Sequence, residues 1–134
     1  MKIPAADNMG LSERGDGVFI PLSSNNNDKG SLFAGSLFSG ATLAAYRATE
    51  RLFEGRGLKG ELVAKTASIN YLKRITTDGL AVAFPVAEPL LKPNGNYTVT
   101  MRARVTDTAG VVGAELTAEF ILLKTHANTP STEG

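Results

Sequence analysis

The chain has 134 residues, a length typical of one domain and too short for two full-sized ones. Apolar residues make up 43% of it, which is enough to build a core and excludes wholesale disorder. Basic and acidic residues number 14 and 13, a balance that argues against a nucleic-acid binder with a concentrated basic face. The absence of cysteine excludes disulfides, thiolate metal sites and a cysteine nucleophile.

Three features of the sequence indicate whether the protein binds metal and where in the cell it is found. His126 is the only histidine, so we expect neither a histidine-rich metal site nor a Ser-His-Asp triad. Residues 1–10 lack the basic and apolar pattern of a signal peptide. The weakly polar run at 31–46 is too short and too mixed to span a bilayer. We therefore predict a soluble cytoplasmic protein that binds no metal and no membrane.

The first part of the chain is predicted to be extended and then to form a loop. Two short extended pieces between Leu11 and Leu22 flank the turn signal Gly15-Asp16-Gly17. Residues 23–30 read Ser-Ser-Asn-Asn-Asn-Asp-Lys-Gly, a composition typical of a polar surface loop.

One long helix is predicted over Ser36–Phe53, with Gly55 as its C-cap. Its first half leaves no clean polar face, and charged residues appear only from Arg47 onward. This pattern predicts a helix that is buried in its N-terminal half and emerges toward solvent in its C-terminal half. In a domain this small, such a helix can be buried only if a sheet wraps around it.

Antiparallel strands are predicted for the rest of the chain. Apolar and polar residues alternate best in the last two strands, where Arg102 and Arg104 would lie across from Glu115 and Glu119. We interpret these four charges as a solvated sheet face. The predicted strands are Glu61–Tyr71, Leu80–Val86, Tyr97–Asp107 and Val111–Leu123.

The order of these elements predicts an α+β hotdog fold, in which a curved antiparallel sheet wraps around one long central helix. We expect a single domain over residues 1–124 and a flexible tail over 125–134. The edge strand of such a sheet is usually paired with a second copy, which predicts a homodimer or a dimer of dimers.

The junction between the polar loop and the helix could stabilise negative charge. The loop ends in Ala34-Gly35-Ser36 at the start of the predicted helix, where unpaired backbone N–H groups can hold a developing oxyanion with the help of the helix dipole. Gly35 would let a thioester carbonyl approach the main chain closely. Alternatively, Gly35 and Ser36 form only an N-cap and a close helix–sheet contact.

The stretch NNNDKGSLFAGSLFSGATLAAYRA, followed by SINYLKRITTDG, resembles a bacterial hotdog family. Its members occur alone or as the C-terminal half of proteins fused to an acetyltransferase-like domain. They were first described as thioesterases and are now associated with decarboxylation of malonyl-acyl-carrier-protein, which yields acetyl-carrier-protein to initiate fatty-acid synthesis. The resemblance covers most of the chain, from Met9 to Leu123. It implies a functional pair, a loop asparagine and a helix threonine, which are Asn27 and Thr42 here.

The residue types on the helix favour decarboxylation over hydrolysis. The predicted helix has no carboxylate before Glu50, and Thr42 stands where one thioesterase branch carries its base. Threonine alone is a poor base, whereas decarboxylation needs only an oxyanion site and a fixed carboxylate. We predict a malonyl-acyl-carrier-protein decarboxylase. The alternatives are an acyl-CoA or acyl-carrier-protein thioesterase, with Asp28 as its base, and a non-catalytic module that binds acyl thioesters.

In the predicted site, the Asn27 amide contacts the thioester oxygen or the leaving carboxylate. The Thr42 hydroxyl completes the site from the same chain or from a partner subunit. The alternative for each residue is structural: Asn27 would only bond its own loop, and Thr42 would only bond a carbonyl of its helix.

Further substrate-binding candidates are basic and apolar side chains. Lys65, Lys73 and Arg74 could meet a phosphopantetheine phosphate or the acidic surface of a carrier protein, or they could be ordinary surface charges. We expect no cofactor, because the substrate itself carries phosphopantetheine or coenzyme A, and the predicted partner is acyl carrier protein or a coenzyme A thioester. The residues that could line an acyl pocket, or simply pack in the core, are Met9, Phe19, Phe33 and Phe38.

Overall fold

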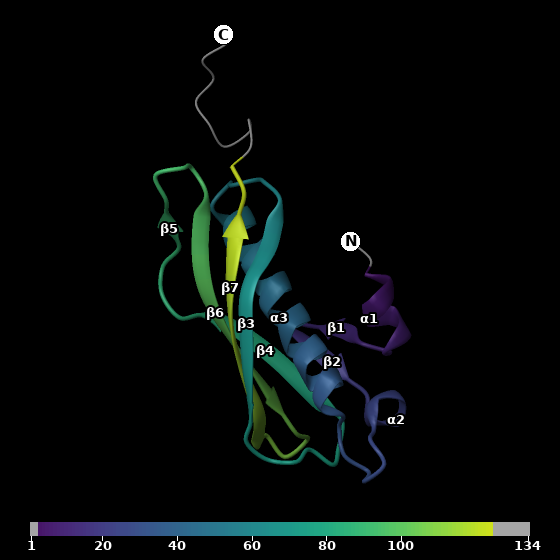
Figure 1. Ribbon diagram of the computed structural model, residues 1–134. Helices are drawn as coiled ribbons and strands as arrows, with labels where there is room; N and C mark the ends of the chain where they lie inside the picture. Colours follow the sequence, from purple (N-terminus) through teal and green to yellow (C-terminus); the bar gives the residue numbers. More distant parts are fainter. Residues whose placement is uncertain (1–2, 125–134) are drawn as a thin grey trace.

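A computed structural model describes residues 3–124, and the predicted tail and His126 lie outside these residues. One long helix lies against one face of a seven-stranded sheet (Figure 1). This arrangement confirms the predicted hotdog fold. The helices are α1 (Pro4–Asn8), α2 (Leu22–Asn25) and α3 (Ala34–Gly55). The strands are β1 (Ser12–Arg14), β2 (Gly17–Ile20), β3 (Leu62–Tyr71), β4 (Gly79–Pro85), β5 (Leu90–Leu91), β6 (Tyr97–Thr106) and β7 (Val112–Leu122).

The sheet has the order β1-β2-β4-β6-β7-β3, with β5 paired to β6 beside this path. Every pairing is antiparallel. β3, the first strand after α3, returns along the helix to the far side of β7 and forms one edge of the sheet (Figure 1).

The core lies between α3 and the concave face of the sheet. The predicted alternation in the last two long strands is confirmed, since every second residue of β6 from Val99 to Val105 is buried. Small residues let the helix approach closely: Ala41, Ala44 and Ala45 are fully buried. At Gly40 a Cβ atom would lie 2.3 Å from Ile20 Cδ1, so a side chain here would push α3 away from β2.

The limits and burial of α3 differ from the sequence prediction. The helix begins at Ala34 and includes Gly55, and the left-handed conformation that ends it belongs to Gly57, with φ of +70°. Its C-terminal half does not emerge fully, because Thr49 and Phe53 are 0% and 2% exposed. The sheet covers the helix there, since the Phe53 ring packs against the Tyr97 ring of β6 with the ring centroids 5.9 Å apart.

Three short elements were not predicted: α1, α2 and β5. α2 begins at Leu22, just before the predicted polar loop, and extends into it; the Leu22 N–H donates to Asp78 Oδ1 at 2.8 Å. This bond comes from a distant part of the chain, so local composition could not indicate it.

In β7, an irregularity opposite Val105 and Thr106 leaves Val112 only half-buried instead of in the core.

The outer face of the sheet carries the predicted ion pairs in part. The Arg104 guanidinium donates to Glu115 at 2.7 Å, and Arg102 lies 3.8 Å from the same carboxylate. Glu119 is paired with Lys65 at 3.9 Å and not with either arginine. Its register partner on β6 is Thr100, which explains the difference. The hydrogen bond from Arg104 lowers the pKa of Glu115 below the ordinary carboxyl value.

The edge strand β3 pairs with β7 on one side only within the described residues. Its central residues are small, and Ala64, Thr66, Ala67 and Ser68 are all exposed. An exposed edge of this length, with Lys65 as its one charge, offers a row of backbone groups to another strand. Within residues 3–124 no helix combines the length and apolar character needed to cross a membrane.

Candidate functional site

The N-terminus of α3 offers two backbone donors. Phe33 caps the helix without a side-chain bond, and its carbonyl accepts from the N–H groups of Ser36 and Leu37, both at 3.0 Å. Within the described chain, the N–H groups of Ala34 and Gly35 make no hydrogen bond. The predicted oxyanion donor at Gly35 is therefore open, whereas the Ser36 amide is engaged in the first turn and the residue is buried.

Asn27 organises the loop that leads into α3. Its Oδ1 accepts from the Lys29 N–H at 2.8 Å and from the Ser31 N–H at 3.1 Å, while its Nδ2 donates to Ser31 Oγ at 2.9 Å. This is the structural role considered above as an alternative. One N–H of the amide remains for another acceptor, because the bond to Ser31 uses a single hydrogen.

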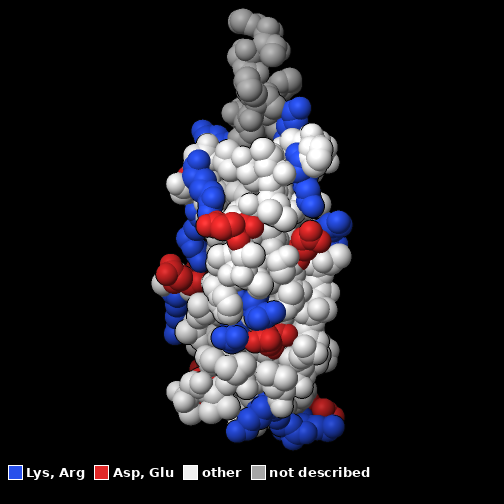
Figure 2. Space-filling model, turned by 90° about the vertical axis from the view of Figure 1, so that its left-hand side faces the viewer, with Lys and Arg blue, Asp and Glu red and all other residues white. Residues whose placement is uncertain are grey.

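Asn27 lines a hollow of about 310 Å³, which we call the loop hollow. The hollow lies where α3 begins and β3 ends, and the Tyr71 hydroxyl bridges these elements by donating to the Ala34 carbonyl at 3.1 Å. Lys73 and Arg74, both exposed, lie on its rim directly after β3. Lys and Arg side chains gather at one end of the molecule in Figure 2. Sequence reasoning identified the two basic residues but missed Tyr71.

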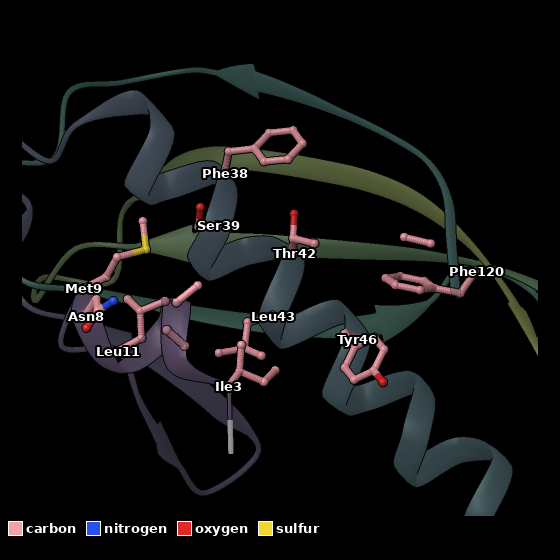
Figure 3. Close-up of a pocket in the computed structure, with 13 residues that line it drawn as sticks. Ile3, Asn8, Met9, Leu11, Phe38, Ser39, Thr42, Leu43, Tyr46 and Phe120 are labelled. Atoms are coloured by element: carbon pink, nitrogen blue, oxygen red, sulfur yellow. The ribbon is translucent and has the colours of Figure 1, made fainter. Parts of the chain in front are cut away.

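Thr42 lines a different and larger hollow of about 550 Å³, which we call the apolar hollow. Figure 3 shows Phe38, Thr42 and Tyr46 following one another along α3. The other walls come from α1 and from the sheet, with Met9 on the first side and Phe120 on the second. Among the described residues that line it, none is Asp, Glu, His, Lys or Arg. The hollow is suited to an apolar group.

The Thr42 hydroxyl is a polar group in the apolar hollow that could bind a ligand. Its Oγ1 is buried and has no hydrogen-bond partner among the described residues. Thr49, one helical repeat further, behaves differently, since its Oγ1 donates to the Ala45 carbonyl at 2.7 Å. The purely structural role considered for Thr42, a bond back to its own helix, is therefore not made. A buried hydroxyl without a partner costs free energy, and a ligand oxygen could satisfy it.

The structure does not bring all predicted residues together. Asn27 and Thr42 line separate hollows of the same chain. Phe19 lies outside both, with the Arg14 guanidinium 3.6 Å from its ring centroid. Lys65 also lies elsewhere, beside Glu119 on the outer face of the sheet. The exposed Phe33 ring lies over Gly35, where a Cβ atom would approach it to 2.7 Å.

The remaining candidates lie in the hollows or the loop, and some contributors were missed. Met9 and Phe38 line the apolar hollow, and Asp28 is exposed in the loop. Asn25 was missed, although its buried amide donates to the Met9 carbonyl at 2.7 Å and so fixes the segment after α1. Tyr46 was missed as a wall of the hollow. The four-residue spacing of Phe38, Thr42 and Tyr46, which places them on one helix face, was the available signal.

The sequence profile of a family described as "Putative thioesterase (yiiD_Cterm)" matches residues 1–124. The chain belongs to this family. The match spans all described residues and confirms the resemblance derived from the loop and helix motifs. A comparison with curated proteins finds no significant match.

Solved structures place the family fold among the hotdog proteins. A "putative thioesterase" from Shewanella oneidensis is 21% identical, with 91% of this chain and 90% of that chain covered and a TM-score of 0.81. The PaaI protein of Escherichia coli is 15% identical, with coverages of 91% and 86% and a TM-score of 0.72. BH2602 from Bacillus halodurans, solved with CoA, is 20% identical, with coverages of 92% and 78% and a TM-score of 0.71. At these identities the similarity establishes the fold alone.

Proposed function

We propose that this member of the family decarboxylates a malonyl thioester, carried by acyl carrier protein or coenzyme A, to the acetyl thioester. The observation that carries the proposal is the unpartnered Thr42 hydroxyl in a hollow whose described lining has no carboxylate or histidine. Hydrolysis needs a base to activate water, and a neutral hydroxyl supplies none. Decarboxylation needs neither a base nor an activated water molecule. It is favoured where a carboxylate leaves water for apolar surroundings.

The reaction breaks one carbon–carbon bond. The bond between the carboxylate carbon and the α carbon of the malonyl group breaks, and carbon dioxide leaves. Its electron pair forms the enolate of the thioester, whose negative charge rests on the thioester oxygen. A proton from solvent then joins the α carbon and gives the acetyl thioester. The protein has to stabilise the enolate oxygen and hold the carboxylate out of the thioester plane.

Neutral donors of this chain suit both tasks. The open N–H groups of Ala34 and Gly35 and the positive end of the α3 dipole would bind the enolate oxygen. The remaining N–H of Asn27 and the hydroxyl of Thr42 would bind the carboxylate or the same oxygen. One well-placed donor typically lowers such a barrier by about 3 kcal/mol.

A two-fold axis through the edge strand β3 would bring the two halves of this site together. The loop hollow includes Tyr71 at the end of β3, and the apolar hollow includes Ala64 near its beginning. When a strand pairs antiparallel with its own copy, the end of one strand lies beside the beginning of the other. Asn27 of one subunit would then face Thr42 of its partner. The proposed enzyme is therefore a homodimer with two shared sites, and two such dimers could assemble further.

The rim of the loop hollow suits the carrier of the acyl group. Lys73 and Arg74 are exposed there and could contact a pantetheine-linked phosphate or the acidic surface of a carrier protein. The Bacillus halodurans neighbour was solved with CoA, which supports a thioester ligand on this fold. No cofactor of the protein's own enters the proposed reaction.

Hydrolysis of an acyl thioester is the second candidate. The description of the family and the Shewanella oneidensis neighbour favour it. Its base would have to be a carboxylate such as Asp28, which is exposed in the loop next to Asn27.

Product analysis separates the candidates. Malonyl-carrier-protein and malonyl-CoA are incubated with the protein, and products are followed by mass spectrometry and free-thiol release. Acetyl thioester and carbon dioxide without free thiol support decarboxylation. Free malonate together with free thiol would establish hydrolysis. An intact substrate that stays bound would indicate a module that only holds acyl thioesters.

A further inference from the structure

Tyr46 stands between two hollows that follow each other along α3. On its N-terminal side lies the apolar hollow with Thr42, and on its C-terminal side lies a second hollow of about 610 Å³, which we call the acidic hollow. Among the described residues, Tyr46 alone lines both. Residues two apart on a strand face the same way. On β3 the first hollow is lined by Ala64 and the second by Leu62, and on β7 the first is lined by Phe120 and the second by Leu122. The hollows are therefore two parts of one trough.

The Tyr46 ring closes the trough against the sheet. Its centroid lies 6.2 Å from that of Phe120, with the rings tilted by 59°. Figure 3 shows both rings at the same end of the apolar hollow. Such a tilted aromatic pair is attractive, so moving the ring aside has a cost in free energy.

The chemistry of the trough changes at the same ring. Before Tyr46 the described lining has no charged side chain, whereas the hollow beyond it is lined by three carboxylates and one lysine: Glu50, Glu54, Glu61 and Lys59. An apolar chain that reached past the ring would lie beside carboxylates and would lose much of the gain from leaving water. The shape of the trough and the polarity of its lining therefore both limit an apolar chain at the Tyr46 ring.

We propose that Tyr46 sets the length of the acyl chain that this site can hold. The thioester lies near Thr42, and the chain runs along α3 until it meets the ring. Tyr46 lies four positions after Thr42 along the helix, a rise of about 6 Å, so the slot takes a short linear chain. The placement beside Thr42 rests on the proposed function, but the chain-length limit does not depend on which reaction occurs there.

Thioether analogues of acyl-CoA test this proposal because they cannot be hydrolysed. Acetyl, butyryl, hexanoyl, octanoyl and decanoyl analogues are titrated into the protein by calorimetry. Each methylene buried in the wild-type slot should tighten binding about fourfold, until the gain stops at one chain length. In Tyr46→Ala this limit should move to a longer chain by at least one member of the series. Tyr46→Phe, which keeps the ring, should retain the wild-type limit.

Tyr46→Leu provides a second variant in case the alanine variant does not fold, which circular dichroism would reveal. An unchanged limit in every folded variant without the ring would overturn the proposal, and so would failure of the wild-type protein to bind any analogue. Decarboxylation of the malonyl thioester together with an unchanged limit would remove only the role of Tyr46. A shifted limit without turnover of malonyl thioester would remove only the proposed reaction.

Discussion

Asn27 and Thr42 lie beside opposite ends of the edge strand β3, in two hollows of one subunit. Asn27 shares its hollow with Tyr71 at the end of the strand, and Thr42 shares its own with Ala64 near the beginning. A strand paired antiparallel with its own copy exchanges these ends. If a site is shared between two subunits, its two residues must lie apart within one chain, as Asn27 and Thr42 do.

Mixing two inactive variants tests whether the site is shared. Asn27→Ala and Thr42→Ala should each abolish most of the turnover of malonyl-carrier-protein. Subunits exchanged by mild denaturation and refolding should regain roughly a quarter of the wild-type rate, since half of the dimers are mixed and each has one intact site. Each variant refolded alone is the control. No recovery in a mixture that contains mixed dimers would place both residues in the same subunit's site.

Removing the Thr42 hydroxyl should affect catalysis and not stability. Thr42→Val keeps the shape of the side chain, and the lost Oγ1 has no hydrogen-bond partner within residues 3–124. We expect turnover to fall by about a hundredfold or more, while the urea midpoint stays unchanged or rises slightly.

Thr49→Val is the matched control for this substitution. Its Oγ1 donates to the Ala45 carbonyl at 2.7 Å inside the core, so the variant should lose about 1 kcal/mol of stability and little activity. Equal activity of the wild-type protein and Thr42→Val would show that the hydroxyl has no part in the reaction.

A charge in the middle of β3 should prevent pairing between subunits. Ala67 is exposed at the centre of the edge strand, where two copies would approach each other across the two-fold axis. Ala67→Asp places like charges together there, and we expect the dimer to weaken by at least tenfold, with activity lost in parallel. Analytical ultracentrifugation gives the measurement. Val111→Asp, in the exposed turn before β7, should leave the dimer intact.

Charge reversal at the rim of the loop hollow should weaken capture of the carrier. In the double variant Lys73→Glu and Arg74→Glu, KM for malonyl-carrier-protein should rise about tenfold or more at low salt with kcat nearly unchanged. The difference from wild type should shrink as salt is added. Lys92→Glu, an exposed residue near β5, is the control. A KM that responds equally to both changes would show that the rim is not the docking surface.

The ion pair on the outer face should make stability depend on acid pH. Arg104 lowers the pKa of Glu115 in the folded protein, so the unfolded chain takes up a proton at a higher pH than the folded one. The stabilisation is present above the ordinary carboxyl pKa and disappears as pH falls through the lowered value. Urea titrations across this range should show a smaller acid loss in Glu115→Gln than in wild type. An identical slope would mean that the pair contributes nothing.

The sequence by itself determined the fold class, the long helix and the strand faces. Alternation from Val99 to Val105 marked the buried face of β6, because a strand turns successive side chains to opposite sides. The motif from Asn27 to Thr42 indicated the family, since it combines a polar loop, a glycine at the helix start and a hydroxyl in the helix. These features depend on residues that are close together in the sequence, so a local sequence pattern is enough to predict them.

Only the tertiary structure decided which residues share a hollow. It placed Phe19 under Arg14 outside both hollows, and it left Thr42 without a partner while Thr49, of the same residue type, bonds its helix. It also set Tyr46 against Phe120 across the trough. These relationships join residues that are distant in the sequence, or depend on which neighbour fills a space. The sheet order and the packing of α3 fix them, and no spacing along the chain does.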